Sequence, residues 1–112
     1  MSHKEDIDSS GRIFKEWRNE LGDLHREDGP AYIYYYEDGS LSIEEFRING
    51  MYHRLDGPAQ IGRFRDGSTW ENFYIDGKYL GRDKEGFWAL WDKLSNQQRQ
   101  APALLRYLMR YS

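Results

Sequence analysis

The chain has 112 residues, the size of a single domain, and its 16 basic and 19 acidic side chains leave a net charge of −3. A negative balance makes nucleic acid an unlikely partner, because binding to phosphates relies on a cationic surface. Without cysteine the chain has no disulfide and no thiolate metal site. No apolar run reaches the roughly 20 residues of a membrane-spanning helix, and no signal-peptide core is visible, so we expect a cytoplasmic protein without a transmembrane segment.

The first residues are polar, and residues 12–24 read as the second half of a degenerate repeat. Trp17 and Gly22 stand where an aromatic residue and a glycine stand in the later copies. We expect three parts within one domain. They are a mobile N-terminal segment (1–11), a sheet of β-repeats (12–82) and a C-terminal helical cap (83–112).

A heptapeptide occurs twice, 28 residues apart, and six of its seven positions are identical. The two boxes are His25-Arg26-Glu27-Asp28-Gly29-Pro30-Ala31 and His53-Arg54-Leu55-Asp56-Gly57-Pro58-Ala59. The copies stay aligned through an Asp-Gly-Ser turn, slip by one residue, and then align Phe46 with Phe73. A fixed period of this kind indicates a supersecondary unit copied along the chain.

Each unit has the pattern of an antiparallel hairpin. Residues 31–36 are rich in strand-forming rings, and Asp38-Gly39 after them supplies the positive φ that a hairpin turn needs. Asn49-Gly50 and Asp76-Gly77 are strong signals for two further hairpins. The alternation predicts a buried face made of Ile33, Ile61, Phe46, Phe73, Ile48 and Ile75.

After Gly81 the pattern becomes helical. Phe87, Leu90, Trp91 and Leu94 recur at the spacing of an amphipathic helix, with Asp83 as its N-cap. Ser95 to Gln98 has the form of a capping box, and Pro102 opens a further helix. On that last helix we expect Leu104, Leu105, Leu108 and Tyr111 to point inward and Arg106 and Arg110 outward. The predicted fold class is α+β, an antiparallel β-meander of repeated hairpins followed by two C-terminal helices.

The chain has aromatic strands that end in Asp-Gly-Ser and are followed by a return strand that ends in Ile-Asn-Gly or Ile-Asp-Gly. This pattern resembles the MORN-repeat superfamily. Residues 34–39 and 73–78 carry the likeness, which covers residues 12–80. The duplicated His-Arg-x-Asp-Gly-Pro-Ala box looks like a variant from bacteria, bacteriophages and large viruses. The resemblance implies stacked β-hairpins that bind proteins or lipids, with antitoxin-like roles suggested for some bacterial members.

The histidines and aspartates of the boxes admit two interpretations. Two His and two Asp could ligate a metal ion or serve a small ligand-dependent enzyme. They could instead tie the Gly-Pro turn, with Asp capping the backbone and His or Arg bonding a carbonyl or an acid in the next hairpin. Because active sites are seldom duplicated in register, we favour the turn interpretation, with no metal, no cofactor and no catalytic residue. The structural turn residues are then His25, Arg26, Asp28, Gly29 and Pro30, and His53, Arg54, Asp56, Gly57 and Pro58.

The second hairpin differs from the first mainly in surface-type residues. Arg63, Arg65, Trp70 and Tyr74 replace Tyr35, Glu37, Ser42 and Arg47. Arg, Trp and Tyr dominate binding hot spots, and an equal alternative is cation–π pairing that only shields the rings from water. The candidate partner-binding residues are Arg63, Arg65, Trp70, Tyr74, Tyr34 and Trp88.

We therefore expect a non-enzymatic module that binds another protein. Concrete forms are a phage or mobile-element inhibitor of a bacterial defence system, as anti-CRISPR proteins are, or an antitoxin-like protein. The metal- or ligand-dependent enzyme stays open, as does an assembly or anionic-lipid tethering protein, since arrays with free edges often form homodimers. The net charge divides into +3 for residues 95–112 and −6 for residues 1–94, so we expect the final helix to meet the acidic sheet of its own domain.

Overall fold

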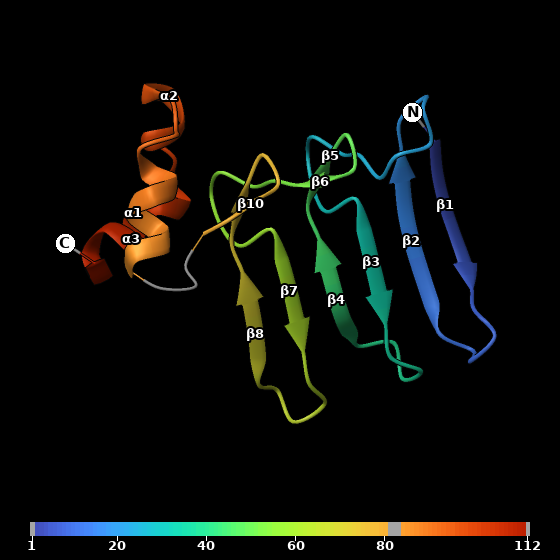
Figure 1. Cartoon of the computed structure of the whole chain (residues 1–112). Helices are drawn as coiled ribbons and strands as arrows, with labels where there is room; N and C mark the ends of the chain where they lie inside the picture. The colour runs from blue at the N-terminus through green and yellow to red at the C-terminus, as the bar shows by residue number, and fades with distance from the viewer. Residues whose placement is uncertain (1, 81–83, 112) are drawn as a thin grey trace.

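The strands precede the helices along the chain, as the sequence predicts (Figure 1). The computed structural model describes residues 2–80 and 84–111. The long strands are β1 (Ser2–Ile7), β2 (Ile13–Arg18), β3 (Tyr32–Tyr35), β4 (Leu41–Glu45), β7 (Gln60–Arg63) and β8 (Thr69–Asn72). The short ones are β5 (Arg47–Ile48), β6 (Met51–Tyr52), β9 (Tyr74–Ile75) and β10 (Lys78–Tyr79), and the helices are α1 (Lys84–Trp91), α2 (Asn96–Arg99) and α3 (Pro102–Tyr111). The predicted α+β meander is confirmed.

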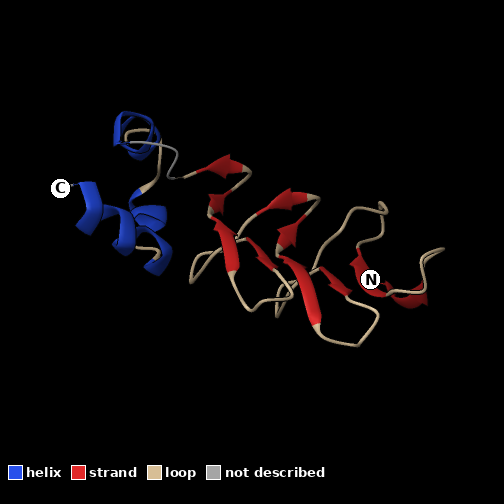
Figure 2. Cartoon of the chain, turned by 90° about the horizontal axis from the view of Figure 1, so that it is seen from below, coloured by secondary structure: helices blue, strands red, loops and turns tan. Residues whose placement is uncertain are grey.

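The long strands form one antiparallel sheet in the order β1-β2-β3-β4-β7-β8. The pairs β5–β6 and β9–β10 form separate two-stranded hairpins. A long hairpin followed by a short one is therefore the repeating unit, and Figure 2 shows the short hairpins turned away from the direction of the long strands. Asn49 and Asp76 take the left-handed backbone conformation in the short turns, with φ of 49° and 50°. Asn and Asp tolerate that conformation better than other non-glycine residues, which is why these turns suit them.

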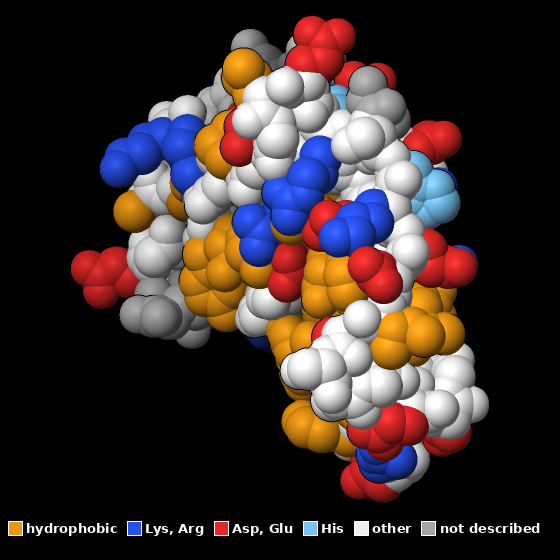
Figure 3. Space-filling model, turned by 90° about the vertical axis from the view of Figure 1, so that its right-hand side faces the viewer, with side chains coloured by type: hydrophobic (Ala, Val, Ile, Leu, Met, Phe, Trp, Pro, Cys, Tyr) orange, Lys and Arg blue, Asp and Glu red, His pale blue; other side chains and the backbone are white. Residues whose placement is uncertain are grey.

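The sheet begins earlier than the sequence predicts. Residues 1–11 were expected to form a mobile segment outside the sheet, but Ser2–Ile7 pairs with β2 along its whole length. All six residues of β1 are exposed, so the strand needs no apolar pattern and leaves none in the sequence. Figure 3 looks at this end of the array, where acidic and basic side chains intermix. Such charges discourage further strand pairing at an edge.

The one-residue slip between the repeats is a β-bulge. The register of the β3–β4 pair shifts between Tyr34 and Tyr35, so that Ser42 on β4 is an extra residue without a partner. The equivalent β7–β8 pair runs without a shift. Ser42 is buried, which shows that the bulge turns this small residue away from water.

The hydrophobic core lies at one end of the array, where the helices meet the β9–β10 hairpin. Its buried members are Phe73, Ile75, Leu80, Phe87, Leu94, Ala101, Leu104 and Tyr107. Figures 1 and 2 place the helices beyond this end, and none of them covers a face of the six-stranded sheet. The molecule measures 45 × 37 × 18 Å, so it is thin in one direction.

This position of the core corrects two predictions. Of the expected buried face, only Phe73 and Ile75 are buried, whereas Ile33, Ile61, Phe46 and Ile48 are half-buried because no second layer of described residues covers them. On α3 the expected inward position of Leu105 is wrong, since its side chain is 59% exposed while Leu104 is fully buried. The remaining α3 expectations hold, with Leu108 and Tyr111 packed against the core.

The cap begins and turns much as its local signals indicate. Ser95 accepts a hydrogen bond from the Gln98 backbone N–H, and the Gln98 side chain accepts one from the Ser95 backbone N–H, so the predicted capping box is confirmed. The N-cap expected at Asp83 lies outside the described residues.

Candidate functional site

The first box holds its arginine on an aromatic ring of the preceding strand. The guanidinium of Arg26 lies 3.9 Å from the centroid of the Trp17 ring. Its Nε–H donates to Asp28 at 3.0 Å, and Nη1 donates to the Pro30 carbonyl at 3.3 Å. The sequence prediction had Asp capping the backbone, but the aspartate instead fixes the arginine.

The second box repeats these contacts one unit later. Arg54 lies 3.9 Å from the Phe46 ring centroid, donates to Asp56 at 3.0 Å and donates to the Pro58 carbonyl at 3.1 Å. A Cβ atom on Gly57 would lie 2.9 Å from the Arg54 guanidinium carbon. The box glycine is therefore the residue that leaves room for the stacked guanidinium.

Each box histidine links its own unit to the next short hairpin. The Nδ1 atom of His25 accepts the Asn49 backbone N–H at 3.0 Å, and that of His53 accepts the Asp76 N–H at 2.9 Å. The histidines thus reach the next hairpin as expected, but they accept a backbone N–H there, whereas a bond to a carbonyl or an acid was expected. Because Nδ1 is already an acceptor in both boxes, these rings act as structural links.

A shared centre of the two His-Asp pairs has no support in this geometry. Within residues 2–80 and 84–111, no group of three or more His, Asp or Glu side chains is arranged to hold a metal ion. The two histidines also line different hollows of the surface.

Leu80 occupies the place in the third unit that His25 and His53 occupy in the first two, and there the arginine over the aromatic ring comes from the helical cap. Leu80 donates its backbone N–H to the Phe73 carbonyl, as His25 does to Trp17 and His53 to Phe46. The guanidinium of Arg106 on α3 lies 5.0 Å from the Phe73 ring centroid and 3.5 Å from a Glu71 oxygen. The expected meeting of the basic helix with the acidic sheet is confirmed for this residue. Sequence reasoning missed the stacking because the pair is 33 positions apart and lies outside the repeat pattern.

One face of the sheet carries a row of large apolar side chains across five strands. Register places Phe14, Tyr34, Ile43, Gly62 and Trp70 in this row, which we call the aromatic row. Gly62 stands where the first repeat has Tyr34, and a Cβ atom there would lie only 1.9 Å from the Trp70 indole. The Trp70 ring therefore lies across β7 in the space that the glycine leaves, and the row continues without a gap in its surface.

Arginines and hydroxyl groups hold the row at the ends of the long hairpins. The Arg12 guanidinium lies 3.9 Å from the Tyr34 ring centroid, and Arg65 lies 4.6 Å from that of Tyr36 while pairing with Glu37 at 2.7 Å. Hydrogen bonds from the Ser10 and Tyr34 hydroxyls hold the pKa of Asp8 well below its usual range. The rings are thus positioned before any partner arrives.

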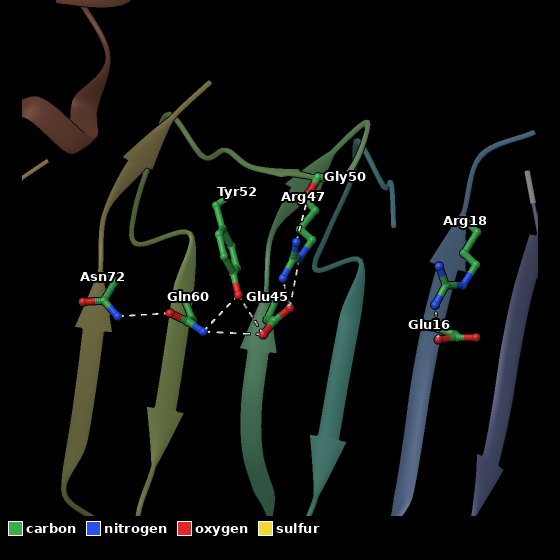
Figure 4. Close-up of polar contacts among 8 residues, drawn as sticks. All are labelled: Glu16, Arg18, Glu45, Arg47, Gly50, Tyr52, Gln60 and Asn72. Atoms are coloured by element: carbon green, nitrogen blue, oxygen red, sulfur yellow. Dashed lines mark hydrogen bonds and ion pairs between the residues drawn. The ribbon is translucent and has the colours of Figure 1, made fainter. Parts of the chain in front are cut away.

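A polar row on the same face lies beside the aromatic row (Figure 4). At its centre Glu45 accepts hydrogen bonds from Arg47 at 3.0 Å and from the Tyr52 hydroxyl at 3.1 Å. Gln60 joins Tyr52 to Asn72 in the same network. Because these side chains satisfy one another, the network stabilises the sheet and leaves the aromatic row as the apolar part of the face.

The candidate partner-binding residues divide between the two faces and the cap. Tyr34, Trp70 and Tyr74 share the face of the aromatic row, where Tyr74 stacks on Tyr52 at 4.8 Å. Arg63 points to the opposite face and pairs with Glu44 at 2.7 Å. Trp88 belongs to the cap, where it packs on Phe87 and donates to the Tyr111 carbonyl. Phe14 and Arg12 were missed because the degenerate first unit matches the later copies clearly only at Trp17 and Gly22.

A scan against protein-family models and searches of curated proteins and of solved structures found no match to this chain. The resemblance to MORN repeats therefore stays a prediction from its residues. Among the described residues, no helix combines the length and the apolar character needed to cross a membrane.

Proposed function

We propose that the chain is a non-enzymatic protein-binding module and that the aromatic row is its contact surface. The observation that carries this proposal is the row itself. Its ring and aliphatic side chains are half-buried and in register, and apart from Arg12 over Tyr34 and Lys4 over Phe14 no described element lies over them. A continuous apolar surface left open on a sheet commonly marks an interaction site.

The dimensions and residue types of the row suit a protein partner. Neighbouring strands lie about 4.8 Å apart, so a row across five strands extends for roughly 19 Å. A standard protein interface of about 800 Å² per partner is roughly 28 Å on a side, so the row spans about two-thirds of that length. Trp and Tyr contribute large contact areas at a small cost in side-chain entropy, and the arginines beside them add directional contacts.

An inhibitor of a bacterial defence system and an antitoxin both act by binding a protein, and we propose them as the concrete forms of this function. The enzyme alternative has less support, since each box histidine accepts a backbone N–H of the next short hairpin and each box aspartate is bonded to the arginine of its own box.

The proposal is tested with Trp70→Ala and a matched control on the same strand, Thr69→Ala, whose exposed side chain points to the opposite face. The wild-type chain captures partners from bacterial lysate, and each captured protein is then purified and titrated by calorimetry against the three forms. We expect Trp70→Ala to weaken binding at least tenfold, as hot-spot tryptophans do, and Thr69→Ala to change it less than twofold.

Circular dichroism establishes that both variants keep the β-rich fold. A partner that binds Trp70→Ala and Tyr34→Ala as tightly as the wild type contradicts the assignment of this face.

A further inference from the structure

A hollow of about 640 Å³ lies between the two boxes. Phe46 and Ile48 form its apolar floor, and Glu27, Asp28, Asp56 and Asp76 contribute carboxylates to its lining. Successive strand residues face opposite sides, so Phe46 points away from the face of Glu45 and of the aromatic row. The hollow is therefore a second surface, separate from the proposed contact surface.

The charge that the hollow offers to a ligand is negative. Its two arginines are engaged within the molecule, since each is stacked on a ring and bonded to the aspartate of its own box. The Glu27, Asp28 and Asp56 side chains are 83%, 84% and 75% exposed. Each arginine donates to one oxygen of the aspartate in its box, and within residues 2–80 and 84–111 the second oxygen of Asp28 and of Asp56 has no hydrogen-bond partner.

A contact between the cap and the sheet shows which kind of side chain binds on this side of the array. Arg106 arrives from a helix far along the chain, lies over the ring of Phe73 and approaches the Glu71 carboxylate. An aromatic ring beside a carboxylate thus already receives an arginine from a separate amphipathic element. In the hollow Arg54 already lies over the Phe46 ring, so a ligand meets the carboxylates beside the remaining surface of that ring and the aliphatic side chain of Ile48.

We propose that the hollow between the boxes binds a basic peptide segment in which arginine or lysine alternates with large apolar residues. The apolar side chains lie on Phe46 and Ile48, and the cationic groups reach the carboxylates of both boxes. The lining of the hollow and this ligand are complementary in charge, and the hollow does not include any residue of the aromatic row.

Two amidated peptides serve as probes, acetyl-Leu-Arg-Leu-Arg-Leu and its glutamate counterpart acetyl-Leu-Glu-Leu-Glu-Leu. Each is titrated into ¹⁵N-labelled full-length protein and followed by the amide resonances of Gly29, Ile48 and Gly57. The test variant is Glu27→Arg, since Glu27 is 83% exposed and lies 3.8 Å from the His25 ring nitrogen. The control is Glu85→Arg, the same charge change at an exposed position of α1.

We expect the basic probe to shift these three amides with saturation, and the acidic probe to leave them unchanged. Glu27→Arg raises the dissociation constant of the basic probe at least fivefold, and Glu85→Arg changes it less than twofold. Three results overturn the proposal. They are no saturable shift with the basic probe at millimolar concentration, equal weakening by both variants, and shifts centred on Trp70. Trp70→Ala protein that binds the basic probe normally separates this site from the contact surface proposed above.

Discussion

Arg54 and Phe46 come from consecutive units, and the guanidinium of Arg54 lies 3.9 Å from the centre of the Phe46 ring. Arg26 stands in the same relation to Trp17, at the same distance. These stacked pairs join unit to unit along the sheet, where no second layer supplies a conventional core. The stability of the array therefore depends on a few repeated contacts between neighbours.

Replacing Arg54 by alanine removes the ring contact and the bonds to Asp56 and Pro58. We expect a loss of about 1–3 kcal/mol in the free energy of unfolding, measured by urea denaturation. Arg54→Lys does not restore the loss, because an ammonium group cannot stack and donate in the same planar arrangement. Lys93→Ala, a change at an exposed cation of the cap, serves as control and stays within about 0.5 kcal/mol.

Gly57→Ala tests whether the box glycine makes room for the arginine. The added Cβ lies 2.9 Å from the Arg54 guanidinium carbon, so the substitution displaces the stacked side chain. We expect it to be destabilising in the wild type and almost neutral in an Arg54→Ala background, as a double-mutant cycle. Gly39→Ala is the contrast, since its cost comes from a φ of +87° in open space and stays the same in both backgrounds. Equal costs of Gly57→Ala in both backgrounds contradict this explanation.

Variants of the Gly62–Trp70 pair test the contribution of Trp70 to stability separately from its contribution to binding. Gly62→Ala places a Cβ in the Trp70 ring, and we expect a destabilisation of about 2 kcal/mol that becomes smaller in a Trp70→Ala background. The double variant Gly62→Tyr with Trp70→Ile recreates the Tyr34–Ile43 pair of the first hairpin. It should unfold within about 1 kcal/mol of the wild type in urea yet lose the partner that the wild type binds. Retained partner binding by this folded variant shows that Trp70 is not an anchor.

Arg106→Ala loosens the cap from the array. The substitution removes the guanidinium that lies over the Phe73 ring and that contacts Glu71. The α3 helix then loses this link to the sheet. Hydrogen exchange at Leu104 and Leu108 should accelerate severalfold, while exchange in β3 and β4 stays unchanged. Arg110→Ala is the matched control, since Arg110 is exposed and lies 5.9 Å from the ring centroid of Tyr107 on the same helix.

Alkaline pH should weaken the cap through Tyr107. Burial raises the pKa of Tyr107 to about 12, whereas the ordinary value is 10.0. As the pH rises above 10 the unfolded chain loses this proton before the folded chain does, so the free energy of unfolding falls by at most about 1.4 kcal/mol per pH unit until pH 12. Tyr107→Phe should make urea midpoints less sensitive to pH over this window. Some sensitivity remains, because burial also raises the pKa of Tyr32 and of Tyr52.

The repeated unit and its turns were predictable because their signals are local. A glycine after Asp, or the Asn49-Gly50 pair, specifies a hairpin through its own backbone preference, and a second copy confirms the period. Pro102 and the Ser95 capping box act within one helical turn, so the cap was predictable in outline. The structural role of the boxes followed from their repetition in register.

The arrangement of these elements in space depends on contacts between distant residues, which no local pattern contains. Strand β1 is exposed along its whole length, and its described contacts are with β2, through backbone pairing and through side chains such as His3, which stacks on Trp17. The open faces of the sheet, the Trp70 ring over Gly62 and the Arg106 guanidinium over Phe73 arise because side chains far apart in the chain fill the space left by one another. Tertiary packing therefore decided which rings stay available to a partner, since burial is a property of the whole assembly of strands and helices.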